Sequence, residues 1–457
     1  MAETATARNP YDGSVIESAR AVSDAAISDL LAQRGSDRGV VVTAPAGAGK
    51  TGFVVHAVGA TRRRKLRVAV GTPTNEQAFS LVRRIAQSSR SETVTFVPAS
   101  TVTLPGDVAA LPNVQQVKAA HANSAAVIVG TLSKLGDAFG RGDLGPVDAL
   151  LVDESYQADS SRYYAVGDLA RLHLLVGDCG QLSPFSTIDD PDHWRGLPED
   201  PLQTAVGVLL RNHPGTPVHK LPITRRLDSR AAKVAQAFYP NLPFSAAVLP
   251  GVRQLRLSPA IATTSRGKLI DRALDSAAAN GWAHVELPAA PAVSADPELI
   301  ELIASMVDRL AQRGPRVRCE FAPAWNGLRP ERVAVGVSHN IQKDILRSRL
   351  DELGHEDIVV ETANKLQGLE FDVLIACHPL AGLVSPDEFH LDSGRLCVLL
   401  TRHRHACILV GRSGDRALLE AIPPASPAYL GFDPDPVYEG WEIHEAVFAA
   451  MESHRLT

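Results

Sequence analysis

Short apolar runs recur along the chain from residue 40 to about residue 420, and helical patterns lie between them. Such an alternation is typical of parallel sheets that are covered by helices on both faces. The first series of runs is GVVVTA (39–44), LRVAVG (66–71), AAVIVG (125–130), VDALLVD (147–153) and RLHLLVGD (171–178). The second series is RVAVGVS (332–338), DIVVET (357–362), FDVLIAC (371–377) and ACILVG (406–411). The pattern therefore predicts an α/β protein with two parallel sheets.

The stretch between the two series predicts where the domains meet. Residues 241–330 are rich in Pro, Ala and Gly and contain one clear amphipathic helix, PELIELIASMVDRLAQRG (297–314). We expect a first domain over residues 1–218 and a second over residues 219–425, with 241–330 as a connecting segment. Residues 426–457 are then a turn-rich C-terminal tail.

The composition is that of a globular chain and excludes several classes. The chain has 457 residues, of which 45% are hydrophobic and 21% charged, and no apolar run is long enough to cross a membrane. The N-terminus, MAETATARNPYDGS, lacks the apolar core of a signal peptide, so we expect a cytoplasmic protein. Five cysteines without C-x-x-C spacing argue against a zinc site or a disulfide framework.

The net charge of −5 gives no general sign of nucleic-acid binding. A basic stretch, TRRRKLR (61–67), offers a local exception that could line a groove. We favour the simpler interpretation of this stretch as the solvated end of a helix.

The stretch VVTAPAGAGKT (41–51) predicts a phosphate-binding loop, because a strand enters a turn of small residues that opens a helix. The backbone N–H groups of such a turn point at one spot, where the helix dipole favours an anion. Lys50 would bind the β- and γ-phosphates of ATP, and the Thr51 hydroxyl would bind Mg²⁺. Ala44 stands at the first glycine of the pattern, and an alanine- and glycine-rich turn is the alternative interpretation. The loop residues expected to hold the nucleotide are Ala46, Gly47, Ala48, Gly49, Lys50 and Thr51.

Two carboxylates follow a buried strand in ALLVDES, at the place where an ATPase needs them. Asp153 would hold Mg²⁺ and Glu154 would act as the general base, although an acidic pair after a strand can also cap a helix. Gln181 follows the next strand and would contact the attacking water and the γ-phosphate.

The order and spacing of these pieces resemble those of superfamily 1 helicases, in the branch that contains the nonsense-mediated-decay helicase. The matching segments are GTPTNEQAFSLVRR (71–84), GTLSKL (130–135), VDESYQ (152–157), GDCGQLSP (177–184), LPITRRLDSRAAKVAQAFYPNL (221–242), VAVGVSHNIQKDIL (333–346), TANKLQGLEFDVLIAC (362–377) and RLCVLLTRHRHACILVG (395–411). GLEF is similar to the UvrD-like branch instead. The resemblance implies two tandem RecA-like domains, ATP and Mg²⁺ as cofactors, and single-stranded DNA or RNA as partner.

The resemblance also implies roles for residues of the second half. Arg226 and Arg402 would reach the γ-phosphate as arginine fingers. A surface ion pair is the alternative interpretation for Arg226 and Arg402. It is a stronger alternative for the neighbouring Arg404. Arg225 stands where the family has a tyrosine, and no residue before the phosphate loop matches the family's adenine-reading glutamine. Three further residues would contact the nucleotide: Gln367, Gly368 and Glu370.

Nucleic acid would be bound by loops that offer small polar groups and backbone amides to phosphate and sugar, independently of sequence. The residues expected there are Thr72, Pro73, Asn75, Gly130, Thr131, His339, Asn340 and Thr362. The sequence thus predicts a nucleic-acid-dependent ATPase that translocates on single strands. An ATP-gated clamp that does not move is the second hypothesis, and a phosphotransferase is a distant third. The spacing leaves no room for large strand-separating domains.

Overall fold

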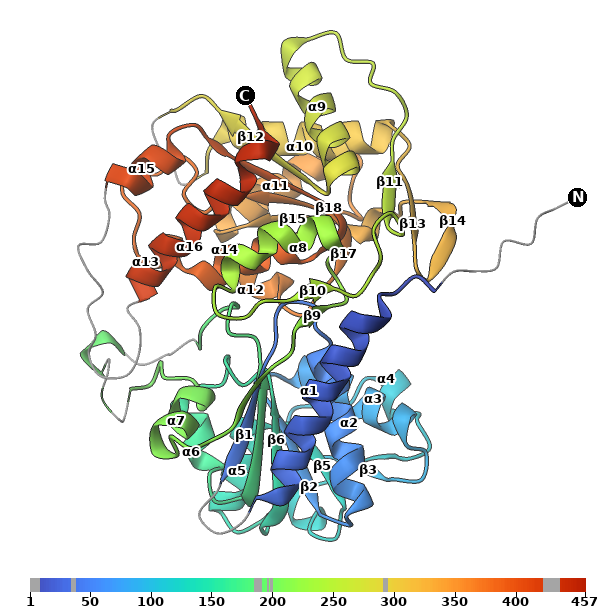
Figure 1. The fold of residues 1–457 in the computed structure, drawn as a ribbon, viewed down its shortest axis with the longest axis vertical. Helices are drawn as coiled ribbons and strands as arrows, with labels where there is room; N and C mark the ends of the chain where they lie inside the picture. Colours follow the sequence, from blue (N-terminus) through green and yellow to red (C-terminus); the bar gives the residue numbers. More distant parts are fainter. Residues whose placement is uncertain are drawn as a thin grey trace, which may run out of the picture.

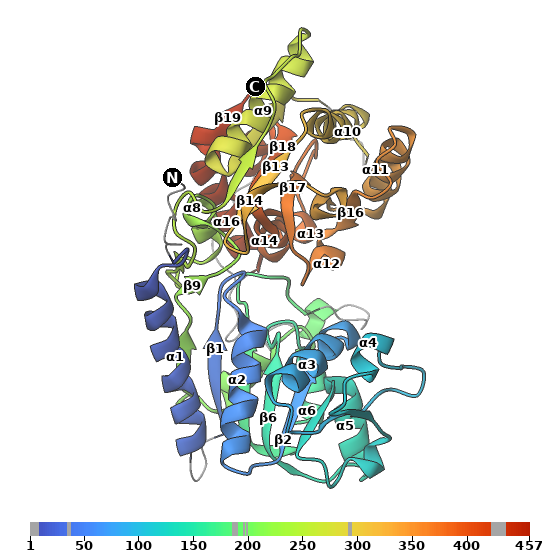
Figure 2. The ribbon, with the colours of Figure 1, turned by 90° about the vertical axis from the view of Figure 1, so that its right-hand side faces the viewer.

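The computed structural model describes residues 9–33, 38–184, 191–194, 197, 200–290, 295–421 and 436–457. These residues form two α/β lobes, one above the other in Figure 1. The chain crosses between the lobes near β9 (Ile223–Thr224), which Figure 2 shows at their junction. Residues 426–435 of the expected tail lie outside the described residues.

The first lobe is built on a parallel sheet whose described strands number eight, in the order β4-β3-β5-β2-β6-β7-β1-β8. β1 lies between β7 and β8, so the residues that follow β1, β7 and β6 reach the same edge of the sheet. The strands are β1 (Gly39–Thr43), β2 (Val68–Thr72), β3 (Val94–Phe96), β4 (Val114–Gln116), β5 (Val127–Thr131), β6 (Val147–Asp153), β7 (Ala170–Gly177) and β8 (Val218–Lys220).

Helices cover both faces of this sheet because successive residues of each strand point to opposite sides. Val40 and Val42 of β1 pack with the helices of one face, whereas Val41 packs with those of the other. On the first face lie α1 (Gly13–Ala32), α2 (Lys50–Arg63), α3 (Asn75–Ser88) and α4 (Gly106–Ala109). On the second lie η1 (Ala119–His121), α5 (Leu132–Gly140), α6 (Ser160–Ala165) and α7 (Ala205–Asn212). The short η2 (Pro191–Trp194) precedes α7 in sequence.

The second lobe contains a parallel sheet of six strands among the described residues, in the order β16-β15-β17-β18-β12-β19. Its strands are β12 (Trp282–Leu287), β15 (Val333–Val337), β16 (Val359–Thr362), β17 (Phe371–Cys377), β18 (His403–Arg412) and β19 (Arg455–Leu456). One core cluster packs α9 (Ser265–Asn280), α10 (Pro297–Gln312) and α11 (Asn340–Glu352) on the sheet. The other face carries α8 (Ser229–Ala235), η3 (Gln236–Phe238), α12 (Ala363–Leu366), α14 (Ser393–Thr401) and α16 (Pro436–Met451). The remaining short helices are η4 (Pro330–Arg332), α13 (Glu388–Leu391), α15 (Asp415–Ala421) and η5 (Glu452–His454).

Two small sheets complete the second half of the chain. β9 pairs with β10 (Ser245–Ala246), and β11 (Gln254–Arg256) pairs with a hairpin of β13 (Arg316–Cys319) and β14 (Ala322–Gly327). The hairpin lies beside the start of α1 in Figure 1, although the two segments are far apart in sequence.

The predicted fold class, α/β with two RecA-like domains of parallel strands flanked by helices, is confirmed. The predicted helix at 297–314 is α10, whose N-cap Asp296 precedes Pro297. The structure adds two strands to the second parallel sheet that the sequence pattern did not indicate. β12 lies within the segment assigned as a connection, and β19 lies in the segment assigned as a tail. Both belong to the second sheet, where β12 pairs with β18 and with β19.

Candidate functional site

The loop between β1 and α2 has the backbone geometry of an anion site. Gly47 and Gly49 adopt φ values of +74° and +94°, which L side chains rarely adopt. A Cβ on Gly47 would also lie 2.4 Å from the Arg226 Cβ, so this glycine has a second reason to be small. No side chain caps α2, and no described residue accepts a hydrogen bond from the N–H groups of Gly47, Gly49, Lys50 or Thr51. Unsatisfied donors at a helix N-terminus are what a phosphate group binds.

The remaining loop residues bind other parts of the protein. The Ala46 N–H donates to the Tyr239 hydroxyl at 2.9 Å, and the Ala46 carbonyl accepts from the Thr224 hydroxyl at 2.8 Å. The Ala48 N–H donates to the Pro45 carbonyl. Four of the six predicted loop residues therefore keep free N–H groups, whereas Ala46 and Ala48 do not.

Lys50 lies between two carboxylates of the first lobe. Its Nζ is 3.1 Å from Asp178 Oδ2 and 3.8 Å from Glu154 Oε1, and its side chain is 8% exposed. Burial lowers the pKa of Lys50, but the charges of Asp178 and Glu154 outweigh it, so the pKa lies above its ordinary value. Lys50 is thus a full positive charge next to the free N–H groups of the loop.

Asp153 and Thr51 meet at the end of β6. The pKa of the Asp153 carboxyl is raised to about 7, because burial and the nearby Glu154 outweigh the opposing effects of Lys50 and of a hydrogen bond with the Thr51 hydroxyl. A carboxylate and a hydroxyl are oxygen ligands of the kind that Mg²⁺ prefers. These two residues fit the metal predicted for them, which would neutralise phosphate charge when bound.

Glu154 holds an unusual backbone conformation for a residue with a side chain, with φ of +54°. Its Oε2 accepts a hydrogen bond from Gln157 Nε2 at 3.2 Å, so the carboxylate has a fixed direction beside Lys50. The expected alternative, a helix cap, is not observed, since Asp159 is the N-cap of the following helix α6.

The predicted glutamines of the two lobes meet each other. Gln181 is buried and donates a hydrogen bond to Asp178, and its Oε1 accepts from Gln367 Nε2 at 3.4 Å. Gly368, the next residue after Gln367, adopts φ of +82°, which turns the chain before β17. The structure therefore brings Gln181 of the first lobe against Gln367 of the second.

Asp178 is the residue that links these groups, and the sequence prediction passed over it. It binds Lys50 and Gln181, and its Oδ1 accepts from the Tyr239 hydroxyl at 2.9 Å. The signal was present in GDCGQ, since this aspartate directly follows a buried strand beside the phosphate loop. The sequence pattern predicts a role only for Gln181 of that segment.

Arg402 is buried at the junction of the lobes without a partner. Its side chain is 1% exposed, and its Nε and Nη2 have no hydrogen bond with any described residue. Its pKa is lowered to about 10, because burial and the nearby Arg226 outweigh the opposing effect of Asp178. Lys50 is also close enough for Arg402 to lower its pKa. A buried, unpaired guanidinium is costly, so this position is suited to a ligand that brings negative charge.

Arg226 lies beside the phosphate loop but is already paired. Its Nε is 3.0 Å from Glu370 Oε2, and its Nη1 donates to the Thr401 carbonyl at 3.2 Å. Glu370, predicted to contact the nucleotide, uses its other oxygen to accept from Arg404 Nη1 at 2.8 Å. In this arrangement Glu370 binds two arginines.

This pairing continues into a buried ion-pair chain that no sequence pattern indicated. Arg404 Nη2 lies 2.5 Å from Glu320 Oε1, and Arg253 Nε donates to Glu320 Oε2 at 2.9 Å. The side chains of Glu320 and Arg253 are 1% and 0% exposed. The ion pairs thus run Arg226–Glu370–Arg404–Glu320–Arg253 and join the β13–β14 hairpin to Arg226. Arg404 is an ion-pair residue, as its rival interpretation stated, but a largely buried one.

The predicted nucleic-acid residues of the first lobe lie at the ends of two neighbouring strands. Thr72 of β2 is in register with Thr131 of β5, and Gly130 precedes it. Pro73 and Asn75 follow β2, where Thr74 caps α3 with Gln77 in a capping box. The Thr72 hydroxyl is buried and donates to the Thr74 carbonyl at 2.8 Å, and Thr131 caps α5. These two threonines shape the loops that follow the two strands.

The second lobe repeats this arrangement. Thr362 of β16 is in register with Val337 of β15, so His339 and Asn340 follow the neighbouring strand at the same edge. His339 stacks on Phe389 with ring centroids 5.1 Å apart, and its Nε2 is 3.2 Å from that of His390. All eight predicted rim residues therefore lie at carboxyl ends of strands or directly after them.

The fold and this site define a two-lobed nucleotide-binding protein of the phosphate-loop type. The first lobe supplies Lys50 and the carboxylates, and Arg402 and Arg226 come from the second half of the chain. Two family models, each described as an AAA domain, match the chain over residues 24–189 and residues 292–414. No curated protein matches the chain. Among the described residues, no helix is long and apolar enough to cross a membrane.

Several solved structures share parts of the fold. The chain is similar to the arterivirus nonstructural protein 10 helicase in complex with DNA, with 13% identity and a TM-score of 0.43 over 88% of this chain and 64% of that one. For the PRRSV helicase the identity is 16% and the TM-score 0.42, over 90% of this chain and 58% of that one. For Dbp5 of S. cerevisiae bound to RNA and ADP BeF3, the identity is 11% and the TM-score 0.40, over 98% of this chain and 94% of that one. The chain thus spans less than two thirds of the two viral helicases, and the function proposed below depends on its own geometry and on the two domain matches.

Proposed function

We propose that this chain is a nucleic-acid-dependent ATPase that translocates on single-stranded DNA or RNA, in the manner of a superfamily 1 helicase. The observation that carries the proposal is the unpaired Arg402, buried beside Lys50 at the junction of the two lobes. A nucleotide on the phosphate loop supplies the negative charge that this arginine lacks. The two AAA-domain matches cover the parts of the chain that contribute Lys50 and Arg402, which supports a shared nucleotide site.

The phosphates of ATP bind the free N–H groups of the loop and Lys50. Thr51 and Asp153 hold Mg²⁺, which supplies charge neutralisation when bound. Glu154, directed by Gln157, takes a proton from the attacking water. Gln181 orients that water and senses the γ-phosphate, and Arg402 stabilises the charge that develops on the transferred group.

Hydrolysis changes the contacts between the lobes, and this change provides movement. While the γ-phosphate is present, Arg402 has a partner that belongs to the first lobe. After its release the arginine loses that partner, so the equilibrium between closed and open lobes shifts. The rims at Thr72–Asn75 and at His339–Asn340 belong to different lobes, and their separation changes with each cycle. A strand held by both rims is then moved stepwise.

The test is single-turnover translocation along labelled strands of increasing length. A lag before dissociation that grows with strand length supports a motor. A lag that does not depend on length would identify an ATP-gated clamp instead, with the same hydrolysis site. Running DNA and RNA strands in parallel establishes which nucleic acid stimulates hydrolysis.

A further inference from the structure

The outer face of the small sheet formed by β11, β13 and β14 carries three arginines. β11 pairs with β13 so that Arg256 lies directly opposite Arg316, and Arg318 follows two residues further along β13, on the same face. The other face carries Leu255 and Val317, which pack against the core of the second lobe. The sheet therefore has one face fixed on the lobe and one basic face.

The positive charges of this basic face are not neutralised by carboxylates. Like charges directly opposite each other on antiparallel strands destabilise a sheet, and the exposed Arg256 and Arg316 are in this relation. Within the ranges that the structure describes, none of the three arginines forms an ion pair, and the nearby Glu320 and Asp275 bind other arginines instead. An arrangement that costs stability in this way is suited to a ligand that brings several negative charges.

An aromatic ring lies within the same face. Trp325 of β14 is partly exposed, and the guanidinium carbon of Arg318 lies 5.1 Å from its ring centroid. Arg316 Nη2 donates to the Trp325 carbonyl at 2.9 Å, which holds this part of β14 beside β13. The Nε of Arg318 is buried and has no hydrogen bond with any described residue. Guanidinium groups beside an aromatic ring are the groups that bind the phosphates and the bases of a single strand.

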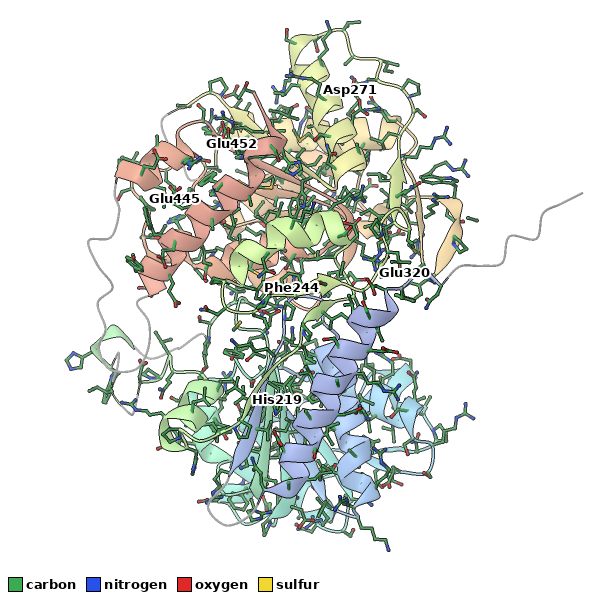
Figure 3. All side chains as sticks on the ribbon, viewed as in Figure 1. His219, Phe244, Asp271, Glu320, Glu445 and Glu452 are labelled. Carbon is green, nitrogen blue, oxygen red and sulfur yellow. The ribbon has the colours of Figure 1, made fainter. Side chains whose placement is uncertain are left out.

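The basic face lies away from the rim of the second lobe that is predicted to bind nucleic acid. The rim residues His339 and Asn340 follow the carboxyl end of β15, whereas β14 leads through η4 into the amino end of that strand. Figure 3 shows Glu320, in the turn of the hairpin, where the upper lobe meets the start of α1. The basic face is thus a separate surface, at the opposite end of the second sheet from the rim.

We propose that Arg256, Arg316, Arg318 and Trp325 form a second binding surface for single-stranded nucleic acid. The inference rests on the proposed function for the identity of the polyanion, but its residues lie outside the nucleotide site and outside both rims. The arginines bind phosphates, and Trp325 stacks on a base, so the surface does not select a sequence. A strand held here stays on the second lobe while the rims change their separation.

Fluorescence anisotropy of labelled DNA and RNA strands of about 30 nucleotides, titrated with the full chain, tests the proposal. The triple variant Arg256→Gln, Arg316→Gln, Arg318→Gln should weaken binding roughly 10- to 100-fold at about 0.1 M salt. The plot of log affinity against log salt concentration should become less steep by about 2, because three phosphate contacts are lost. Hydrolysis of ATP without nucleic acid should be unchanged.

The matched control is the triple variant Arg63→Gln, Arg64→Gln, Lys65→Gln. It removes the same number of positive charges from exposed residues of the first lobe, and it should leave the affinity and the salt dependence nearly unchanged. Equal losses in the two triple variants would show that binding responds to the total charge of the chain, and would overturn the proposed surface.

Trp325 is tested separately, because stacking does not depend on salt. Trp325→Ala should weaken binding by about 5- to 150-fold, as expected for one stacked base, without changing the salt dependence. Binding should quench the tryptophan fluorescence of the parent, and this quenching should largely disappear in Trp325→Phe, which keeps a ring and still binds. An unquenched parent, or an unchanged affinity of Trp325→Ala, would overturn the stacking role.

Two further outcomes separate this inference from the proposed function. A poly-glutamate peptide that displaces the strand as well as unlabelled nucleic acid does would identify a surface for acidic proteins and overturn the inference. A loss of binding in the rim variant Asn340→Ala, with none in the arginine triple variant, would overturn the inference alone. If the parent binds neither DNA nor RNA, the nucleic-acid dependence of the proposed function and this inference fail together.

Discussion

The two lobes build their shares of the site in different ways. In the first lobe Lys50, Asp153, Glu154 and Asp178 each lie at the end of a strand, directly after one, or at the start of the helix that follows it. In the second half of the chain, Arg226 depends on Glu370, Arg404, Glu320 and Arg253, which come from separate segments. Strand ends in a parallel sheet place side chains together by topology alone. In a chain of ion pairs, the position of each charged side chain depends on its neighbours in the chain.

The two groups of residues should therefore respond differently to substitution. In the proposed function the first-lobe groups contact the phosphates and the attacking water, so their removal should stop hydrolysis. The ion-pair chain holds Arg226 and the hairpin, so its disruption should alter stability and geometry. Arg402 belongs to neither group, because it comes from the second lobe but pairs with no described residue.

The largest effect is expected for Lys50→Ala, which removes the charge that binds the β- and γ-phosphates. Hydrolysis should fall to background in a steady-state phosphate-release assay. Lys118→Ala, at an exposed lysine of the same lobe, is the control. Turnover near that of the parent would show that the loop around Gly47 and Gly49 is not the phosphate site.

Arg402→Ala should lower the hydrolysis rate by roughly 10³- to 10⁵-fold while leaving ADP binding largely intact, because the β-phosphate is held by the loop. Arg226→Ala should lower the hydrolysis rate by a smaller factor, since Arg226 is already paired with Glu370. The double variant should be little worse than Arg402→Ala, as residues that stabilise one transition-state charge act together. Single-turnover rates measure all three, with Arg329→Ala as an exposed control. Fully multiplicative losses would mean that the two arginines act at different places.

Glu154→Gln should keep ATP bound and slow hydrolysis by about 10²- to 10⁴-fold, because the amide keeps the shape but cannot accept the proton. Nucleotide titrations and single-turnover rates on the same sample separate binding from chemistry. A loss of affinity with an unchanged rate would instead make Glu154 a structural residue.

The sequence predicted the first lobe's share of the site well because each residue lies in a local pattern. A strand, a glycine turn and a lysine within eleven residues are sufficient to place Lys50 and Thr51, and the run before Asp153 marks β6. Asp178 also follows a buried strand, but its contact with Lys50 joins residues 128 positions apart, which no local pattern indicates. The site roles themselves remain predictions.

The second half was harder to predict because its structure depends on distant partners. β12 lies in a Pro- and Ala-rich region and becomes a strand by pairing with β18, more than a hundred residues later. A glutamate in a hairpin is normally expected to be exposed, and only the convergence of Arg253 and Arg404 permits Glu320 to be buried. No local pattern carries that information.

Glu320→Gln tests whether the ion-pair chain stabilises the fold. The variant leaves the buried Arg253 without an opposite charge, whereas Arg404 keeps its pair with Glu370, so we expect a loss of about 3–5 kcal/mol in the free energy of unfolding. Urea unfolding followed by circular dichroism measures it. Glu301→Gln is the matched control, since Glu301 also pairs with an arginine but is 41% exposed, and such pairs contribute about 0–1 kcal/mol. Equal effects of the two variants would show that burying these ion pairs adds nothing to the free energy of unfolding.

The smallest effect concerns three buried histidines of the second lobe, which lie away from the ion-pair chain. His378 contacts the His444 ring, and Phe448 lies against both His284 and His378. Burial lowers the pKa of His284 to about 4 and that of His444 to about 3, and it lowers the pKa of His378 strongly. All three are therefore neutral in the folded protein at pH values where an unfolded histidine, with a pKa of about 6.5, takes up a proton.

Because the unfolded chain binds more protons below pH 6.5, the free energy of unfolding should fall as the pH decreases from about 6.5 towards 4. Each histidine contributes up to about 1.4 kcal/mol per pH unit in that range. His444→Phe removes one titrating group while keeping a ring beside His378. Between pH 7 and pH 5, the free energy of unfolding of this variant should therefore fall by about 2 kcal/mol less than that of the parent. Urea unfolding at the two pH values measures the difference, and His121→Phe, at an exposed histidine of the first lobe, is the control. An identical pH dependence of His444→Phe and the parent would show that His444 is not held neutral by burial, and that the acid sensitivity of the second lobe arises from other groups.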